Sequence, residues 1–198
     1  MKQRKIFIWS IVGMLIAFIL DKPFVYLMQH LEIELLNQPI MWITSIYFVF
    51  VVLIVMGAAF MWNEKKYEYM LPLILSFCVA IGVAYLLKYI IMRPRPFIEL
   101  GVRSLVILKS YSFPSAHAAA VFSAMAILDK EFPKMKWIWL TIAVVVALSR
   151  LYIGVHYLSD VIAGGILGYF VGLVIIAAEE RFKPFIVVKK WFIRLHKR

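Results

Sequence analysis

Three short segments of the sequence combine ionisable or hydroxyl side chains with apolar neighbours: KYIIMRPRP at 88–96, PSAH at 114–117 and SRLYIGVHYLSD at 149–160. The first and third contribute the cations Lys88, Arg95 and Arg150. Buried together without an anion, these cations would repel one another, whereas guanidinium groups match the oxygens of a phosphate. We therefore expect the three side chains to surround a phosphate group.

Ser115 and His117 stand at the expected start of a helix. Pro114 precedes them, and the alanine-rich run that follows Ser115 predicts the helix itself. A serine at this position caps the first turn, and the free backbone amides there bind anions. We expect Ser115 to bind the phosphate, and His117 to protonate the leaving oxygen and then to activate water.

His156 and Asp160 are four residues apart, so on one helix the carboxylate lies next to the imidazole. The carboxylate can hold one ring nitrogen as N–H and leave the other free as a nucleophile. Attack on a bound phosphoryl group would then give a phosphohistidine.

A metal site is the alternative use of these side chains, because His117, His156 and Asp160 could form a triad with an open position. Against it, the region has no carboxylate cluster, and three cations in the same place oppose a divalent ion. We predict a reaction without a metal or other cofactor.

The elements that position these residues are expected to cross a membrane. Of the 198 residues 64% are hydrophobic, and apolar runs of about 20 residues span a bilayer as helices. The sequence predicts an all-α bundle of six transmembrane helices in a single domain covering residues 1–198. The expected spans are 6–20 with a continuation to 28, 41–62, 70–92, 113–128, 137–155 and 156–178.

The first span is interrupted by Asp21, Lys22 and Pro23, and a basic start precedes it. A signal peptide would also have a basic start before an apolar run, but this segment lacks a small-residue cleavage site and is interrupted by these three residues. We favour a retained first helix with a kink at the proline.

The rise of a helix, about 1.5 Å per residue, sets the depth of the polar residues. Lys88, Ser115, Arg150 and Asp160 each lie roughly 20 to 29 Å from the opposite ends of their helices. Because the hydrocarbon core is about 30 Å thick, all four reach its outer third. They can form one pocket at the level of the outer headgroups.

The net charge of +11 is explained by the membrane and does not indicate a nucleic-acid partner. If the spans alternate, most basic residues between them fall on one side, which the positive-inside rule makes cytoplasmic. Both termini are then cytoplasmic, and the basic, aromatic tail lies along the anionic inner surface. The residues concerned are Lys2, Arg4, Lys5, Lys65, Lys66, Lys130, Lys134, Lys136 and the tail from Arg181.

Two further features are structural in our interpretation. Gly164, Gly168 and Gly172 recur every four residues and would let another helix approach closely. Cys78 is the only cysteine, so no intrachain disulfide can form.

In order and spacing, the three segments resemble the signature of the type 2 phosphatidic acid phosphatase family. Lys88, Arg95 and Pro96 match its first part, PSAH its second, and Ser149, Arg150, His156 and Asp160 its third. The resemblance covers residues 88–160. It implies that His156 is the nucleophile, Asp160 its orienting acid and His117 the acid and base. It also implies a set of phosphate ligands, namely Lys88, Arg95, Ser115, Arg150 and a backbone amide near Ala116.

Two positions need comment beside this resemblance. The family usually has glycine where this chain has Ala116, and a first helical turn tolerates alanine, so we expect activity to survive. Arg93 is an additional cation, which would contact either a second phosphate or a lipid headgroup.

The resemblance implies a phosphatase, and the membrane spans indicate a lipid phosphate as its substrate. With the predicted orientation, the substrate would enter from the outer leaflet. A polyprenyl diphosphate such as undecaprenyl diphosphate is the favoured substrate, and phosphatidate, phosphatidylglycerophosphate and a lipid A phosphate compete with it. The alternative of another class is an anionic-lipid transporter that binds phosphate without hydrolysis. The sequence fixes neither the lipid nor the oligomeric state.

Overall fold

The computed structural model describes residues 2–63 and 69–182. Within these ranges all regular secondary structure is helical, so the all-α prediction is confirmed. The elements are α1 (Lys2–His30), α2 (Glu34–Ile43), α3 (Ile46–Phe50), the π-helical turn η1 (Val51–Val55), α4 (Met56–Asn63), α5 (Met70–Ile91), α6 (Pro96–Glu99), α7 (Ala116–Glu131), the 3-10 turn η3 (Pro133–Met135), α8 (Lys136–Tyr152) and α9 (Leu158–Phe182).

Five stretches among the described residues are long and apolar enough to cross a membrane. They are Val12–His30, Ile46–Asn63, Met70–Glu99, Pro133–Tyr152 and Leu158–Phe182. The expected fourth span, 113–128, corresponds to α7, which runs from Ala116 to Glu131 and has 16 residues, fewer than the roughly 20 that cross a bilayer. The count of six is therefore not confirmed, although the membrane-spanning helical bundle is.

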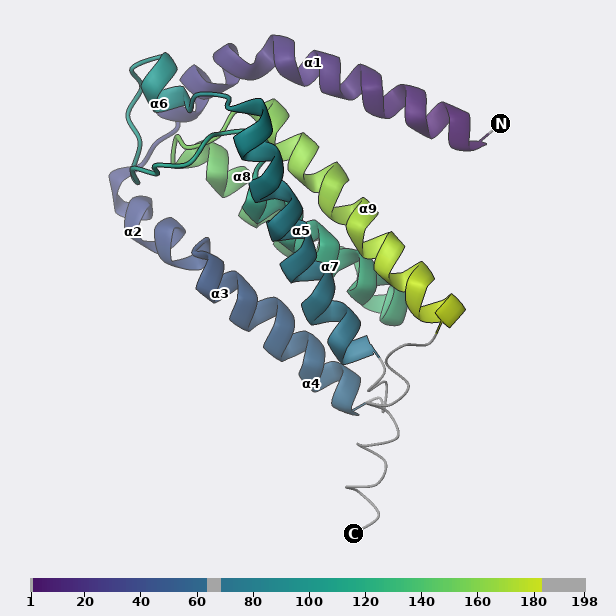
Figure 1. The fold of residues 1–198 in the computed structure, drawn as a ribbon. Coiled ribbons are helices and arrows are strands. Elements are labelled where there is room, and N and C mark those ends of the chain that lie inside the picture. Colours follow the sequence, from purple (N-terminus) through teal and green to yellow (C-terminus); the bar gives the residue numbers. More distant parts are fainter. Residues whose placement is uncertain (1, 64–68, 183–198) are drawn as a thin grey trace.

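Helix α7 forms the centre of the bundle, with its most extensive contacts to α9 and further contacts to α5 and α8 (Figure 1). Its alanines allow this close packing, since Ala118, Ala119 and Ala120 are completely buried. The facing side of α9 carries the predicted glycine seam. A Cβ atom at Gly168 would overlap the carbonyl oxygen of Ala119, and one at Gly172 would lie 2.6 Å from the Cβ of Ala126.

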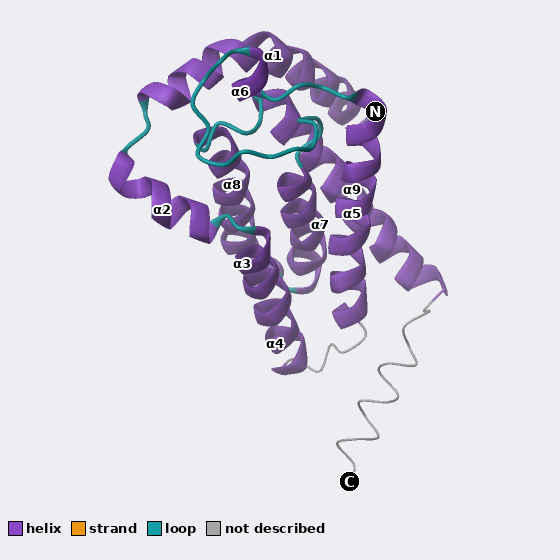
Figure 2. Cartoon of the chain, turned by 60° about the vertical axis from the view of Figure 1, so that its left-hand side comes forward, coloured by secondary structure: helices purple, strands orange, loops and turns teal. Residues whose placement is uncertain are grey.

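Helix α1 crosses one end of this bundle and contacts α9 and α8 (Figures 1 and 2). It is continuous from Lys2 to His30 with Pro23 inside it. The residues that interrupt the apolar pattern, Asp21 to Pro23, thus lie within the helix and do not end it.

The polar connections gather at the same end of the bundle (Figure 2). There α5 and α8 end and α7 and α9 begin, joined by the segments 92–115 and 153–157. The segment between the first two expected spans contains α2, which ends at Ile43 with Thr44 as its C-cap. This end of the molecule carries the predicted site.

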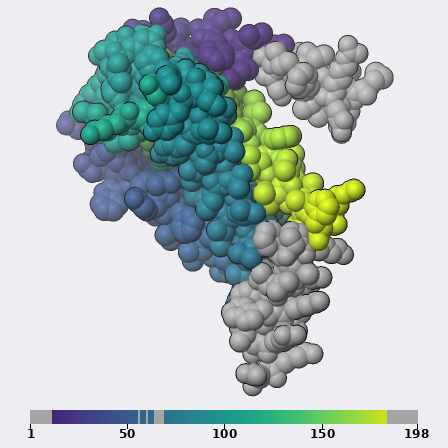
Figure 3. Space-filling model, in the orientation of Figure 1, coloured from purple at the N-terminus to yellow at the C-terminus, as the bar shows by residue number. Residues whose placement is uncertain are grey.

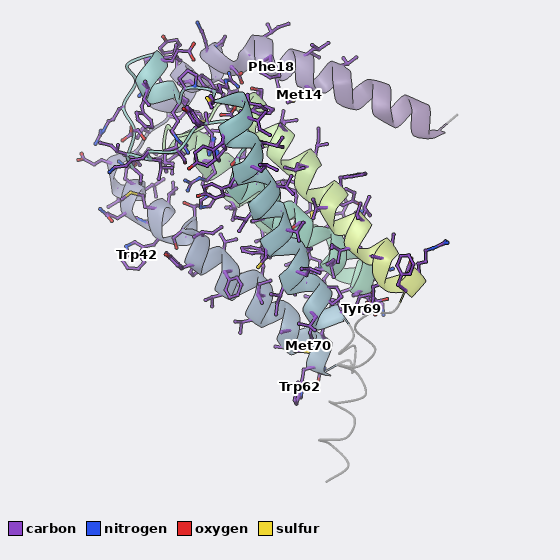
Figure 4. All side chains as sticks on the ribbon, in the orientation of Figure 1. Met14, Phe18, Trp42, Trp62, Tyr69 and Met70 are labelled. Carbon is purple, nitrogen blue, oxygen red and sulfur yellow. The ribbon has the colours of Figure 1, made fainter. Side chains whose placement is uncertain are left out.

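The surface of the bundle is apolar, as a lipid-facing surface must be. On α5, which faces the viewer in Figure 3, Leu86 and Ile90 are 62% and 65% exposed. Trp42 lies beside the junction of α2 and α3, and Trp62 lies at the far end of α4 (Figure 4). Tryptophans near both ends of a span are typical of the two membrane interfaces.

Candidate active site

The three motif-bearing segments converge at the end of the bundle where the connections gather. Lys88 and Arg150 lie in the last turns of α5 and α8. Ser115 is the N-cap of α7, and Asp160 lies in the first turn of α9. Because α5 and α8 run antiparallel to α7 and α9, the C-terminal ends of the first pair lie at the same end of the bundle as the N-terminal ends of the second pair. The structure therefore brings together side chains that are up to 72 residues apart in the sequence, as Lys88 and Asp160 are.

His156 and Asp160 are in contact, with 3.3 Å between the imidazole Nδ1 and the carboxylate Oδ2. The spacing of four residues predicted this contact, but not its local structure, because α9 begins only at Leu158. His156 lies in the preceding turn, where Gly154 adopts a φ of +75° and packs against the backbone of Arg103. The carboxylate also accepts a hydrogen bond of 2.9 Å from the Tyr157 amide, which fixes the turn.

The imidazole of His156 is 2% exposed, and its Nδ1 faces both Asp160 and the hydroxyl of Ser112. The hydroxyl itself donates to Oδ2 of Asp160. Burial lowers the pKa of His156 well below its ordinary value, and the nearby charges of Lys88 and Arg95 act in the same direction. The imidazole is therefore neutral at neutral pH, with Nε2 carrying the free lone pair.

Lys88 and Arg95 are held by carbonyl oxygens of the surrounding loops. The ammonium of Lys88 donates to the carbonyls of Tyr111 and Ser112, both at 2.8 Å. Arg95 donates through Nη1 to the Val155 carbonyl at 2.7 Å, and through Nε and Nη2 to Ser110 at 2.6 and 3.0 Å. These bonds orient both cations without neutralising either charge.

Arg150 is bound far less completely. Its side chain is buried, yet its only described hydrogen bond is a long one of 3.4 Å from Nη1 to the Thr44 carbonyl. Among the described residues, Nε has no hydrogen-bond partner. A guanidinium has five N–H donors, and buried donors without partners are costly. An anion bound beside Arg150 would satisfy them.

Ser115 caps α7 as predicted, with its hydroxyl accepting from the Ala118 amide at 3.4 Å. Its own amide donates to the Asp160 carbonyl at 2.9 Å, which ties the start of α7 to α9. The first-turn amides at Ala116 and His117 precede the hydrogen-bonded part of the helix and are free to bind an anion. His117 interacts electrostatically with Arg150, His156 and Lys88, so it borders the same cluster.

Arg93 was expected to contact either a second phosphate or a lipid headgroup, and the structure shows protein partners that neither expectation included. Its guanidinium donates from Nη2 to Asp21 at 2.7 Å and from Nη1 to Asp160 at 2.9 Å. It also stacks over the ring of Tyr157, with 3.9 Å to the ring centroid. Arg93 thus lies between two carboxylates.

Three residues of this site were missed by sequence reasoning, namely Asp21, Ser112 and Ser159. Asp21 carried a usable signal, since an ionisable residue inside an apolar helix usually has a functional partner. The two serines carried no such signal, because serine is a common residue and nothing in the sequence indicates its partners.

Among the residues that the structure describes, no group of three or more metal-ligating side chains is suited to hold a metal ion. The metal-free reaction stays a prediction. Together, the fold and the site define a helical membrane protein with a buried cluster of cations beside an imidazole in contact with a carboxylate.

The particular family follows from comparison with known proteins. The profile of the PAP2 superfamily matches residues 69–184, and the chain belongs to this family. An undecaprenyl-diphosphatase from Sulfolobus acidocaldarius is 37% identical over 56% of this chain and 55% of its own length. Phosphatidylglycerophosphatase B from Bacillus subtilis is 34% identical over 70% of this chain and 71% of its own length. The chain thus spans about half the length of the archaeal relative.

Solved structures agree with this assignment. The crystal structure of a transmembrane PAP2 type phosphatidylglycerolphosphate phosphatase from Bacillus subtilis has a TM-score of 0.69 at 25% identity. The match covers 90% of this chain and 98% of the other. LpxE from Aquifex aeolicus has a TM-score of 0.62 at 25% identity, covering 80% of this chain and 95% of the other.

Proposed function

We propose that this protein is a membrane phosphatase that hydrolyses a lipid phosphate or diphosphate through a phosphohistidine. The observation that carries the proposal is the buried His156, oriented by Asp160 at 3.3 Å and adjacent to an incompletely bonded Arg150. Family membership supports it, since the relatives include an undecaprenyl-diphosphatase and a phosphatidylglycerophosphatase.

The reaction proceeds in two steps. Lys88, Arg95, Arg150, Ser115 and the amide near Ala116 bind the phosphoryl oxygens. Nε2 of His156 attacks the phosphorus, and the bond to the leaving oxygen breaks as His117 donates a proton to that oxygen. His117 then takes a proton from water, which attacks the phosphohistidine, and inorganic phosphate leaves with neutral His156 restored.

Polyprenyl diphosphates are the proposed substrates, with undecaprenyl diphosphate as the example. The apolar surface of the bundle allows a lipid tail to remain in the bilayer while its phosphate reaches the cationic cluster. We place this cluster at the outer leaflet and both termini in the cytoplasm. The basic residues between α7 and α8, at the opposite end of the bundle, support this orientation.

An anionic-lipid transporter is the second candidate, because the same cations would bind phosphate without cleaving it. Transport does not require an imidazole whose ring nitrogen is held by a carboxylate. The pairing of His156 with Asp160 therefore favours hydrolysis.

The test is phosphate release by purified protein in liposomes from undecaprenyl diphosphate, phosphatidylglycerophosphate and phosphatidate. His156→Ala removes the nucleophile and should lower kcat by about a thousandfold or more. His30→Ala is the matched control, because His30 is an exposed histidine at the end of α1. Full turnover by His156→Ala would refute the phosphohistidine, and no turnover of any lipid by the wild type would favour the transporter.

A further inference from the structure

Asp21 is a buried carboxylate in the middle of α1, a helix that contributes none of the residues predicted for the site. Only 3% of the residue is exposed. A charged side chain at such a position is costly unless it is paired and hydrogen-bonded. Asp21 also lies outside the segment 69–184 that matches the family profile. Its partners therefore indicate what α1 adds to this protein.

The first partner of Asp21 is the N-terminus of α9. Oδ1 accepts a hydrogen bond of 2.8 Å from the Ser159 amide, and Oδ2 accepts one of 2.6 Å from the Ser159 hydroxyl. The amides of a first helical turn have no partner within their own helix, and a carboxylate there is favourable. Asp21 thus caps α9 from a different helix, across 138 positions of sequence.

The second partner is Arg93, which connects Asp21 to the candidate catalytic pair. The guanidinium donates from Nη2 to Asp21 and from Nη1 to Oδ1 of Asp160 and to the Ser159 hydroxyl, at 2.7, 2.9 and 2.7 Å. Its face is held by Tyr157 and by Phe18, which lies one turn before Asp21 on α1 (Figure 4). The position of Arg93 is fixed by α1 on one side and by α9 on the other.

This arrangement separates the tasks of the two oxygens of Asp160. Oδ1 accepts from Arg93, while Oδ2 faces His156 and accepts from the Tyr157 amide. A carboxylate is planar, so fixing Oδ1 also fixes the direction of Oδ2. If Asp21 did not hold Nη2, the fork of Arg93 would be free to bind both oxygens of Asp160, as arginine prefers. That interaction would compete with the Tyr157 amide and the Ser112 hydroxyl, which hold Oδ2 toward the imidazole.

We propose that Asp21 and Arg93 are positioning residues, through which α1 orients the Asp160 carboxylate and, by it, the His156 imidazole. The proposal rests on the phosphatase function proposed above. Neither Asp21 nor Arg93 is assigned a contact with the substrate, because both oxygens of Asp21 and both Nη atoms of Arg93 are hydrogen-bonded within this group.

The test is a steady-state comparison of Asp21→Asn with the wild type in liposomes. Loss of an outer partner of a catalytic group costs about tenfold or more, so kcat should fall by about tenfold. KM should change by less than about twofold, because Lys88, Arg95 and Arg150 keep their partners. Lys22→Gln is the matched control on the same helix, since Lys22 is exposed and, among the described residues, is paired with Glu99 at 3.8 Å.

Arg93→Lys keeps the positive charge but loses the planar guanidinium, whose two Nη atoms bind the two carboxylates. It should therefore show the same loss of kcat with an unchanged KM. This second variant tests the proposal even if Asp21→Asn does not fold. The double variant should lose no more than about twofold beyond the worse single variant, because the two residues act in series.

Three results would overturn the proposal: unchanged kcat in both single variants, a change confined to KM, or multiplicative losses in the double variant. Each of these leaves wild-type turnover intact and so leaves the phosphatase function standing. Absence of turnover in the wild type, by contrast, refutes the function itself.

Discussion

At the scale of single residues, the candidate site is built from side chains whose chemistry is unusual in an apolar chain. Histidines, arginines and a lysine in otherwise uncharged segments stand out, and the spacing of His156 and Asp160 predicts their contact. Ser112 and Ser159 do not stand out, since their roles depend on partners brought close only by the fold. Arg93 was noticed, but its partner Asp21 lies 72 positions away, and no local pattern connects the two.

The pH dependence of kcat/KM is the prediction at this scale. Burial, together with Lys88 and Arg95, lowers the pKa of His156 below its ordinary value of about 6.5. A base with a lowered pKa stays deprotonated through neutral pH and is lost only as the pH falls below that lowered value. In the pH profile of kcat/KM, the decrease on the acidic side that we assign to protonation of His156 should therefore lie below about pH 6.5.

Titration of the substrate phosphate can also produce an acidic limb in the pH profile of kcat/KM. The variant Lys88→Met distinguishes titration of His156 from titration of the substrate. Removing the positive charge of Lys88 should raise the pKa of His156 and move the acidic limb of the residual activity to higher pH. The free substrate titrates identically in both assays. A limb at the same pH in wild type and variant would contradict our assignment to His156.

At the scale of elements, apolar run length predicts helices well and their ends poorly. The run 113–128 predicts a span, whereas α7 begins after Ser115 and ends at Glu131, so both ends are shifted by three residues. Its 16 residues are fewer than the roughly 20 that cross a bilayer. The helix α2 and the π-helical turn η1 have no counterpart in the predicted pattern. The glycine seam was predicted correctly because its period follows directly from helix geometry.

Gly168→Ala tests the importance of this seam. The added Cβ would overlap the Ala119 carbonyl, which is backbone and cannot rotate away. We expect the variant to be destabilised by about 1 to 3 kcal/mol, as in other overpacked cores. Thermal unfolding in detergent measures the loss. Gly82→Ala is the control, because a Cβ there meets nothing within 4 Å, and equal unfolding temperatures of the two variants would contradict close packing at Gly168.

At the scale of the whole molecule, charge is divided between the two ends of the bundle. The site lies at the end where α7 and α9 begin, while Lys130, Lys134 and Lys136 lie at or near the junction of α7 and α8 at the other end. The predicted basic tail beyond Phe182 and the pair Lys65 and Lys66 fall outside the described residues, as does the proposed contact of the tail with the inner surface. Orientation in the membrane therefore depends on the positive-inside rule and needs a direct measurement.

Labelling of single cysteines in intact cells provides this measurement. Cys78→Ala gives a background without cysteine, into which Ile107→Cys or Lys134→Cys is introduced; both positions are exposed and lie at opposite ends of the bundle. A membrane-impermeant maleimide should label position 107 in intact cells and position 134 only after permeabilisation. The reverse pattern would place the cationic cluster in the cytoplasm. In that case the substrate phosphate would have to be presented from the inner leaflet, and recycling of a carrier from the outer leaflet would be excluded.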